Sequence, residues 1–142
     1  MGNAQDPNMA AGTGNNHLEV LVVEDDPDIN QMVGAYAEIA GFRYRSALNG
    51  ETALREAHSS HPSLIVLDVM LPDLDGFEVC RRLKSDRKTS GIPVLMLTAL
   101  DRDEHRRSGA ECGAAAYMTK PFDPDKLLEM MRSLARHEPS AN

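Results

Sequence analysis

Short apolar runs rich in β-branched residues alternate with segments of helical periodicity from Leu18 onward. This alternation is typical of repeated βα units, in which successive strands run parallel. The first, third and fourth runs are almost continuously apolar, as strands covered by helices on both faces must be. The pattern therefore predicts an α/β domain built on a parallel sheet.

Five strands and five helices are predicted. The strand segments are Leu18–Glu24, Phe42–Ala47, Leu64–Asp68, Ile92–Thr98 and Ala115–Thr119. The second segment alternates charged residues with Tyr44, which favours a place at the edge of the sheet. The helices are predicted after Asp26, from Asn49 to His58, from Asp75 to Lys84, from Asp101 to Gly109, and after Asp123.

The helix starts carry recognisable signals. Asp26 before Pro27, and Asp123 before Pro124, each pair an N-cap with a proline in the first turn. Asp101 and the glutamate three residues later form a capping-box pattern for the fourth helix. That helix has no strongly apolar residue at helical spacing before Gly109. We therefore expect it to be weakly anchored and to concentrate the motion of the domain.

Length and composition limit the classes of protein. A chain of 142 residues suits one domain, which we place at 18–136, between a disordered leader at 1–17 and a polar tail at 137–142. The net charge of -7 opposes nucleic-acid binding. No apolar run approaches the roughly 20 residues that span a bilayer. We expect a cytoplasmic protein, with Cys80 and Cys112 as buried thiols in a reducing compartment.

Acidic side chains stand where predicted strands end. Glu24 and Asp25 follow the first strand, and Asp68 ends the third. In an open parallel sheet, the functional crevice lies outside the carboxyl ends of the strands. Carboxylates brought together there repel one another unless a cation lies among them, and hard oxygen ligands suit Mg²⁺. The sequence therefore predicts a magnesium site at this edge.

Two further groups belong to the same rim. Thr98 ends the fourth strand, and Lys120 follows the fifth. A metal and a lysine can neutralise the oxygens of a phosphoryl group while an aspartate attacks the phosphorus. The predicted rim thus has the groups that phosphoryl transfer needs.

Four motifs in register resemble the receiver domain of two-component response regulators over essentially all of Leu18–Arg136. They are VLVVEDD at Val20–Asp26, LIVLDVMLPDLDGFEV at Leu64–Val79, VLMLTA at Val94–Ala99 and YMTKPF at Tyr117–Phe122. The resemblance implies a single doubly wound (βα)5 domain of the flavodoxin-like type, with strand order 2-1-3-4-5. The chief departure is Glu24, where an aspartate is also common.

The resemblance also implies roles for the acidic residues. Asp68 would accept the phosphoryl group from a histidine kinase or a phosphotransfer protein. Asp25 and Asp68 would ligate Mg²⁺ directly, Glu24 would act mainly through water, and Met70 would contribute its backbone carbonyl. No enzymatic activity beyond self-phosphorylation and autodephosphorylation is implied.

The remaining site residues would sense the phosphoryl group. Lys120 would pair with the phosphoryl oxygens, and Thr98 and the backbone N–H of Ala99 would bind them in the phosphorylated state. Tyr117 would be the rotameric switch. Met70 and Leu100 lie where the family varies its self-hydrolysis rate, and both are apolar, so we expect slow to intermediate autodephosphorylation.

Output is expected through protein contacts. The sequence stops at Asn142 soon after the fifth helix, so we expect a switch that binds a downstream protein effector. The contact face would combine the fourth helix, the fifth strand and the fifth helix. If the chain is a piece of a longer regulator, this face would also support a homodimer.

Other interpretations compete with this one. The first is a receiver-like module that binds its partners constitutively and uses no phosphate. The complete set of rim residues argues against it, namely Glu24, Asp25, Asp68, Thr98 and Lys120. A flavin carrier would need a phosphate-binding loop where EDDPD stands. A magnesium-dependent phosphatase would need a substrate pocket that the short loops do not provide. Asp73, Asp75 and Gly76 lack the further ligands of a calcium loop and are interpreted as a loop leading into a helix cap.

Overall fold

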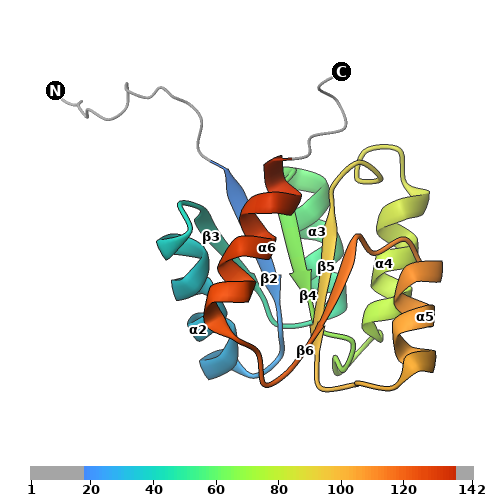
Figure 1. The fold of residues 1–142 in the computed structure, drawn as a ribbon. Coiled ribbons are helices and arrows are strands. Elements are labelled where there is room, and N and C mark those ends of the chain that lie inside the picture. Colours follow the sequence, from blue (N-terminus) through green and yellow to red (C-terminus); the bar gives the residue numbers. More distant parts are fainter. Residues whose placement is uncertain (1–17, 137–142) are drawn as a thin grey trace, which may run out of the picture.

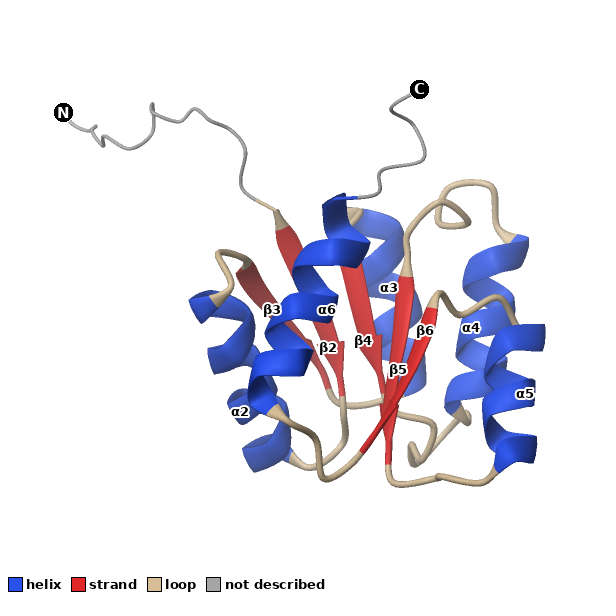
Figure 2. Ribbon diagram, in the orientation of Figure 1, coloured by secondary structure: helices blue, strands red, loops and turns tan. Residues whose placement is uncertain are grey.

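A five-stranded parallel sheet stands between two layers of helices in the computed structural model, which describes residues 18–136 (Figures 1 and 2). The strands are β2 (Glu19–Val23), β3 (Arg43–Ala47), β4 (Leu64–Leu67), β5 (Val94–Thr98) and β6 (Ala116–Thr119). The helices are α2 (Pro27–Ile39), α3 (Gly50–Ser60), α4 (Gly76–Ser85), α5 (Asp103–Glu111) and α6 (Pro124–Arg136). Strands and helices alternate along the chain, as predicted.

The strand order is β3-β2-β4-β5-β6, which is 2-1-3-4-5 in chain order and confirms the predicted doubly wound fold. All four pairings are parallel. β3 lies at one edge, as its alternating charges predicted, and β6 lies at the other. The order reverses between β2 and β4, so the loops that follow these two strands flank the crevice of the sheet.

Each face of the sheet has its own core. α2 and α6 cover one face with apolar side chains that include Val33, Leu127 and Met131. α3 and α4 cover the other face, where Val79 and Leu83 pack on the strands. The three central strands, β2, β4 and β5, are almost fully buried between these layers. Their continuously apolar sequences follow from this double cover.

Side-chain caps begin the helices around the site. The Asp26 carboxylate accepts the N–H groups of Asp28 and Ile29, as the Asp-Pro signal predicted. Asn49 caps α3 through the N–H of Thr52, and Asp75 caps α4 through the N–H of Glu78. These bonds satisfy N–H groups that a helix cannot satisfy internally, so they fix where each helix leaves the sheet edge.

The start of α5 differs from the prediction. The N-cap is Arg102 rather than Asp101, and the backbone N–H of Arg102 donates to Nδ1 of His105 at 3.3 Å. The predicted capping box of Asp101 and Glu104 is therefore wrong, because a histidine in the first turn takes the role of the glutamate. Gly109 is the only fully buried residue of α5. The predicted scarcity of apolar anchors is thus confirmed.

Both thiols are buried, as predicted, and neither Cys80 nor Cys112 forms a disulfide. Within residues 18–136, no helix is long and apolar enough to cross a membrane. The predicted leader, 1–17, and the predicted tail, 137–142, lie outside the described residues.

Candidate functional site

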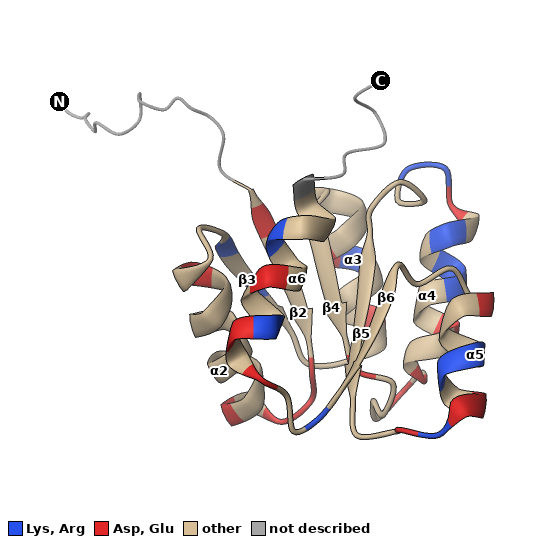
Figure 3. Cartoon of the chain, in the orientation of Figure 1, with Lys and Arg blue, Asp and Glu red and all other residues tan. Residues whose placement is uncertain are grey.

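The carboxyl ends of the strands bring the predicted site residues to one edge of the sheet. Acidic segments follow β2 and β4 at the lower edge in Figure 3, and a basic position follows β6 there. Glu24 and Asp68 are only 5% and 6% exposed, and Thr98 is completely buried. Buried carboxylates require compensating partners, because desolvation of a charge is costly.

Lys120 is the partner of both buried carboxylates. Its ammonium Nζ lies 2.5 Å from Oε1 of Glu24 and 3.0 Å from Oδ2 of Asp68. The lysine reaches them from the loop after β6, and the peptide bond that joins it to Pro121 is cis. A cation is thus held at the centre of the pocket, within bonding distance of the predicted phosphoacceptor.

The protonation equilibria of this pair follow from burial and charge. Burial pulls the pKa of Lys120 down, but the hydrogen bonds and charges of Glu24 and Asp68 together outweigh it and raise that pKa. Lys120 therefore stays protonated at neutral pH. Burial raises the pKa of Glu24, although the bonds from Lys120 and from the Asp26 N–H oppose the change. The attraction of Lys120 is what keeps a carboxylate in such a buried place.

Glu24, Asp25 and Asp68 form an acidic cluster. Each offers a carboxylate oxygen, and these oxygens lie within 4.8 Å of one another. Asp25 is exposed, so the cluster is open to solvent on one side. Three carboxylates exceed the charge of the single ammonium beside them. An oxygen-rich, partly open site with excess negative charge fits a hard divalent cation such as Mg²⁺.

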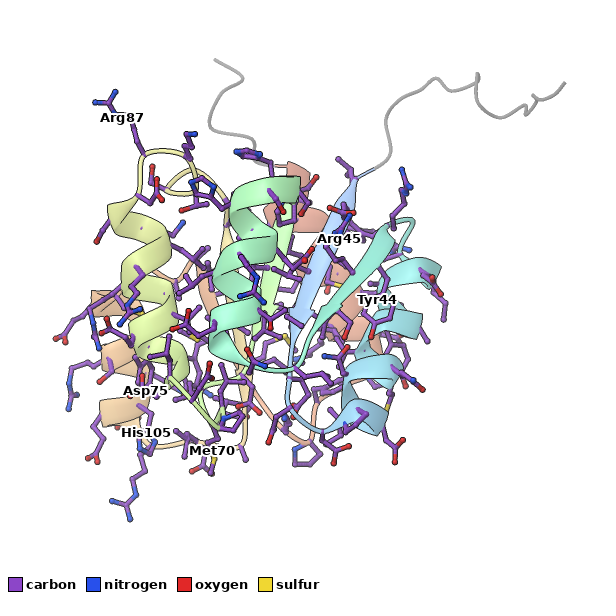
Figure 4. All side chains as sticks on the ribbon, turned by 180° about the vertical axis from the view of Figure 1, so that it is seen from behind. Tyr44, Arg45, Met70, Asp75, Arg87 and His105 are labelled. Carbon is purple, nitrogen blue, oxygen red and sulfur yellow. The ribbon has the colours of Figure 1, made fainter. Side chains whose placement is uncertain are left out.

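The loop after β4 holds the carboxylate of Asp68 on its other side. The backbone N–H of Met70 donates to Oδ1 of Asp68 at 3.2 Å. The Met70 side chain is 58% exposed at the lower end of the molecule, where Figure 4 shows it far from Arg87. Gly76 lies so close that a Cβ there would meet the carbonyl of Asp68 and come within 2.7 Å of the Val69 Cα. The glycine therefore permits α4 to start against the strand end.

Thr98 and Ala99 lie on the β5 side of the edge. The Thr98 hydroxyl accepts the N–H of Leu100 at 3.4 Å, and the Thr98 carbonyl accepts the N–H of Lys120 at 2.9 Å. Ala99 is exposed. The hydroxyl is bound to its own loop here and makes no bond to Asp68 or Lys120.

Tyr117 on β6 is half-buried under α5. Its hydroxyl donates to the carbonyl of Leu100 at 2.8 Å, and the guanidinium of Arg106 lies 5.2 Å from the ring centre. Burial raises the pKa of Tyr117. A Cβ at Gly109 would come within 2.9 Å of the ring, so this glycine leaves the space that the ring occupies. Tyr117 thus links the loop after β5 to α5.

The sequence did not reveal two polar residues near the site. The Asp73 carboxylate accepts the N–H groups of Gly50 and Glu51 at 2.8 and 2.9 Å, and these bonds lower its pKa. They tie the loop that follows Asp68 to the start of α3. Asn30 is 1% exposed in α2, behind the acidic cluster. Neither residue has a local sequence signal, because the partners are distant in the chain.

The fold and this pocket define a class of protein: doubly wound α/β domains with an acidic, lysine-bridged pocket at the carboxyl edge of the sheet. The family model of the response regulator receiver domain matches residues 20–132. The chain belongs to this family, the receiver domains of two-component signalling systems.

Relatives support this assignment. The DNA-binding dual master transcriptional regulator RpaA of Synechocystis is 44% identical over 82% of this chain and 48% of its own length. The alkaline phosphatase synthesis regulator PhoP of Bacillus subtilis is 42% identical over 83% of this chain and 48% of its own length. The chain thus spans about half the length of the curated relatives it matches.

Solved structures show the same fold. A putative response regulator from Chloroflexus aurantiacus superposes with a TM-score of 0.82 at 32% identity, covering 86% of this chain and all of the other. The BeF3-activated receiver domain of Klebsiella pneumoniae RstA gives 0.78 at 32% identity, covering 84% and 99%.

Proposed function

We propose that this domain accepts a phosphoryl group on Asp68 from a histidine kinase or a phosphotransfer protein. The observation that carries the proposal is the environment of the Asp68 carboxylate. It is buried, bonded to the Lys120 ammonium, and within 4.8 Å of carboxylate oxygens of Glu24 and Asp25. A nucleophile with cationic support on one side and a cation-binding cluster on the other suits phosphoryl transfer.

The reaction balances with the groups of this pocket and the donor. A carboxylate oxygen of Asp68 forms a bond to phosphorus as the bond from phosphorus to the donor histidine nitrogen breaks. The imidazole leaves with the electron pair of that bond. Lys120, already protonated beside Asp68, neutralises charge on the transferred oxygens. The acyl phosphate that results stores the signal.

Mg²⁺ is the cation that the acidic cluster is proposed to hold. Asp25 and Asp68 would be direct ligands, with the backbone carbonyl of Met70, and Glu24 would act mainly through water. When bound, the metal would neutralise negative charge on the phosphoryl oxygens. Without the metal, the carboxylates of Asp25 and Asp68 would repel an incoming phosphoryl group.

The proposed output is a change of partner binding at the face built from α5, β6 and α6. Thr98 and the Ala99 N–H would turn toward the phosphoryl group, away from the present bond with Leu100. Tyr117, bonded to the Leu100 carbonyl and covered by Arg106, would carry that shift to α5. A downstream effector, or a second copy of the domain, would then read the altered face.

Autodephosphorylation is proposed to be slow to intermediate. Met70 and Leu100 lie two residues beyond Asp68 and Thr98, at the positions where receiver domains vary their self-hydrolysis rate, and neither offers a carboxylate or amide to orient an attacking water. A phosphoryl half-life of a few seconds at neutral pH would contradict this part of the proposal.

Intact-mass measurement after incubation with acetyl phosphate, with and without Mg²⁺, tests the central step. We expect one phosphoryl increment that requires Mg²⁺ and is labile to base. Asp68→Asn should lose it, whereas Asp75→Asn should keep it. Asp75 caps α4 from the same loop, and asparagine also caps helices, so this variant is a matched control.

The absence of an increment in the wild-type protein would overturn the proposal. The domain would then be a receiver-like module that binds its partners constitutively. An increment that survives in Asp68→Asn would place the phosphoacceptor at another residue.

A further inference from the structure

A buried amide lies directly behind the acidic cluster. Asn30 is on α2 and is 1% exposed. Its Nδ2 lies 3.2 Å from the carbonyl of Val22, 3.0 Å from that of Glu24 and 3.1 Å from that of Ala47. Two N–H groups serve three carbonyl oxygens, so one hydrogen is shared. The amide therefore joins the ends of β2 and β3 to α2.

These carbonyls belong to the place where the β2–β3 ladder stops. The last paired residues are Val23 and Ala47. Beyond them, the N–H of Glu24 still donates to the Ala47 carbonyl at 3.1 Å, and the Glu24 carbonyl accepts from Asn30. Both backbone polar groups of Glu24 are thus held. Without the amide, these buried carbonyls would lose a partner at the point where the strand becomes the metal-binding loop.

Asp25 depends on this backbone. Within residues 18–136, no hydrogen bond or ion pair fixes its exposed carboxylate, in contrast to the carboxylates of Glu24 and Asp68. The main chain that Asn30 holds one residue earlier therefore sets where the Asp25 side chain starts relative to Asp68.

Tyr44 determines which way the amide faces. Its hydroxyl donates to Oδ1 of Asn30 from the neighbouring strand β3, where Figure 4 shows Tyr44 beside α2. The oxygen must then face the phenol, which leaves the NH₂ group for the three carbonyls. Gly34 completes the arrangement, because a Cβ at that position would collide with the Tyr44 ring. A glycine, a tyrosine and an asparagine thus form one packed unit.

We propose that Asn30, oriented by Tyr44, is a positioning residue that sets the backbone of Glu24 and Asp25 and thereby the affinity of the acidic cluster for Mg²⁺. This inference rests on the proposed function of that cluster. Residues that hydrogen-bond to metal-binding segments without contacting the ion support its binding, and their substitution lowers metal affinity. A role in folding alone would leave the affinity unchanged.

Calorimetric titration of the phosphate-free protein with Mg²⁺ measures the affinity without any activity assay. We expect Asn30→Ala to weaken binding about tenfold, the lower end of the range for lost support of a metal ligand. Tyr44→Phe keeps the ring and removes only the orienting hydroxyl, so it should weaken binding about threefold, as expected for one hydrogen bond.

Thr89→Val is the matched control. Thr89 is also buried, at 2% exposure, and its hydroxyl donates to the Leu83 carbonyl at 2.7 Å. It lies in the loop after α4, close in the chain to Arg87 at the end of the molecule opposite Met70 (Figure 4). This variant loses a buried bond of similar kind without touching the site. It should bind Mg²⁺ as the wild type does.

The outcomes separate the two proposals. Wild-type affinity in both Asn30→Ala and Tyr44→Phe would overturn the positioning role and leave the proposed function intact. A wild-type protein that does not bind Mg²⁺ would overturn both. If Asn30→Ala does not fold, the Tyr44→Phe variant decides, because weaker binding would support the role and unchanged binding would refute it.

Discussion

The two sides of the pocket are built differently. On the side of β2, α2 and β4, buried strands, a helix cap and a four-bonded amide hold the carboxylates. On the side of α5 and β6, the strand is only half-buried and the helix has one buried residue, Gly109. The contacts of the first side keep the carboxylates in place, whereas α5 has few buried contacts that must break before it can move. This difference suits the proposed switch, in which the carboxylates stay in place while the proposed sensing residues move.

Hydrogen exchange tests this contrast most directly. We expect the amides of α5 to exchange roughly 100-fold faster than those of β2, because little apolar surface must be exposed to open α5. Mass spectrometry of exchanged peptides measures both in one sample. Equal protection of α5 and β2 would remove the contrast.

Truncations on the two sides should have unequal costs. Asn30→Ala removes the amide bonds to three carbonyls and leaves the Tyr44 hydroxyl without its acceptor, although the Ala47 carbonyl keeps its bond from the Glu24 N–H. We therefore expect a loss of about 2 to 4 kcal/mol in unfolding free energy. Arg106→Ala on α5 removes an exposed cation–π contact and should cost about 0.5 kcal/mol. Urea denaturation compares the two variants. Similar losses would show that the two sides are equally well anchored.

Lys120 joins the two sides, and its removal should separate them. We expect Lys120→Ala to be phosphorylated still by acetyl phosphate, because Asp68 remains beside the proposed metal site. The phosphorylated variant should lack the change in hydrogen exchange of α5 and α6 that we expect in the phosphorylated wild type, since no ammonium would link the phosphoryl group to the loop after β6. A variant that keeps the wild-type change would contradict this role.

Asp73 provides the smallest test, through pH. The bonds from the Gly50 and Glu51 N–H groups lower its pKa from the ordinary 3.8, so the folded state favours the carboxylate. Its contribution to stability is therefore complete above pH 3.8 and is lost as the pH falls through the lower pKa of the folded protein. Asp73→Asn should lose less than about 1 kcal/mol at pH 7, because the residue is exposed.

Asp75→Asn is the control, because it removes a carboxylate charge from the same loop and also keeps an oxygen that can cap a helix. The difference in urea midpoint between Asp73→Asn and the wild type should shrink at the acid end of a pH series. A difference independent of pH would mean that the charge of Asp73 has no part in holding the loop.

Much of the site could be predicted from the chain alone. Glu24, Asp68 and Thr98 end apolar strands, and parallel strands bring such ends to one edge, so their proximity followed from the pattern. The caps by Asp26, Asn49 and Asp75 were also predictable, because each bond spans two or three residues. The start of α5 was not, because arginine and histidine replaced the usual capping residues there.

Local chemistry and hydrophobic periodicity were thus enough to determine the class of fold, the helix caps other than that of α5, and the acids at the strand ends. The tertiary structure alone decided that Lys120 joins Glu24 to Asp68, that Asp73 caps a helix 23 positions away, and that Asn30 holds two strand ends. The physical reason is the range of the interactions. A cap or an apolar stripe acts within a few residues, whereas these bonds exist only once the sheet has brought distant segments together.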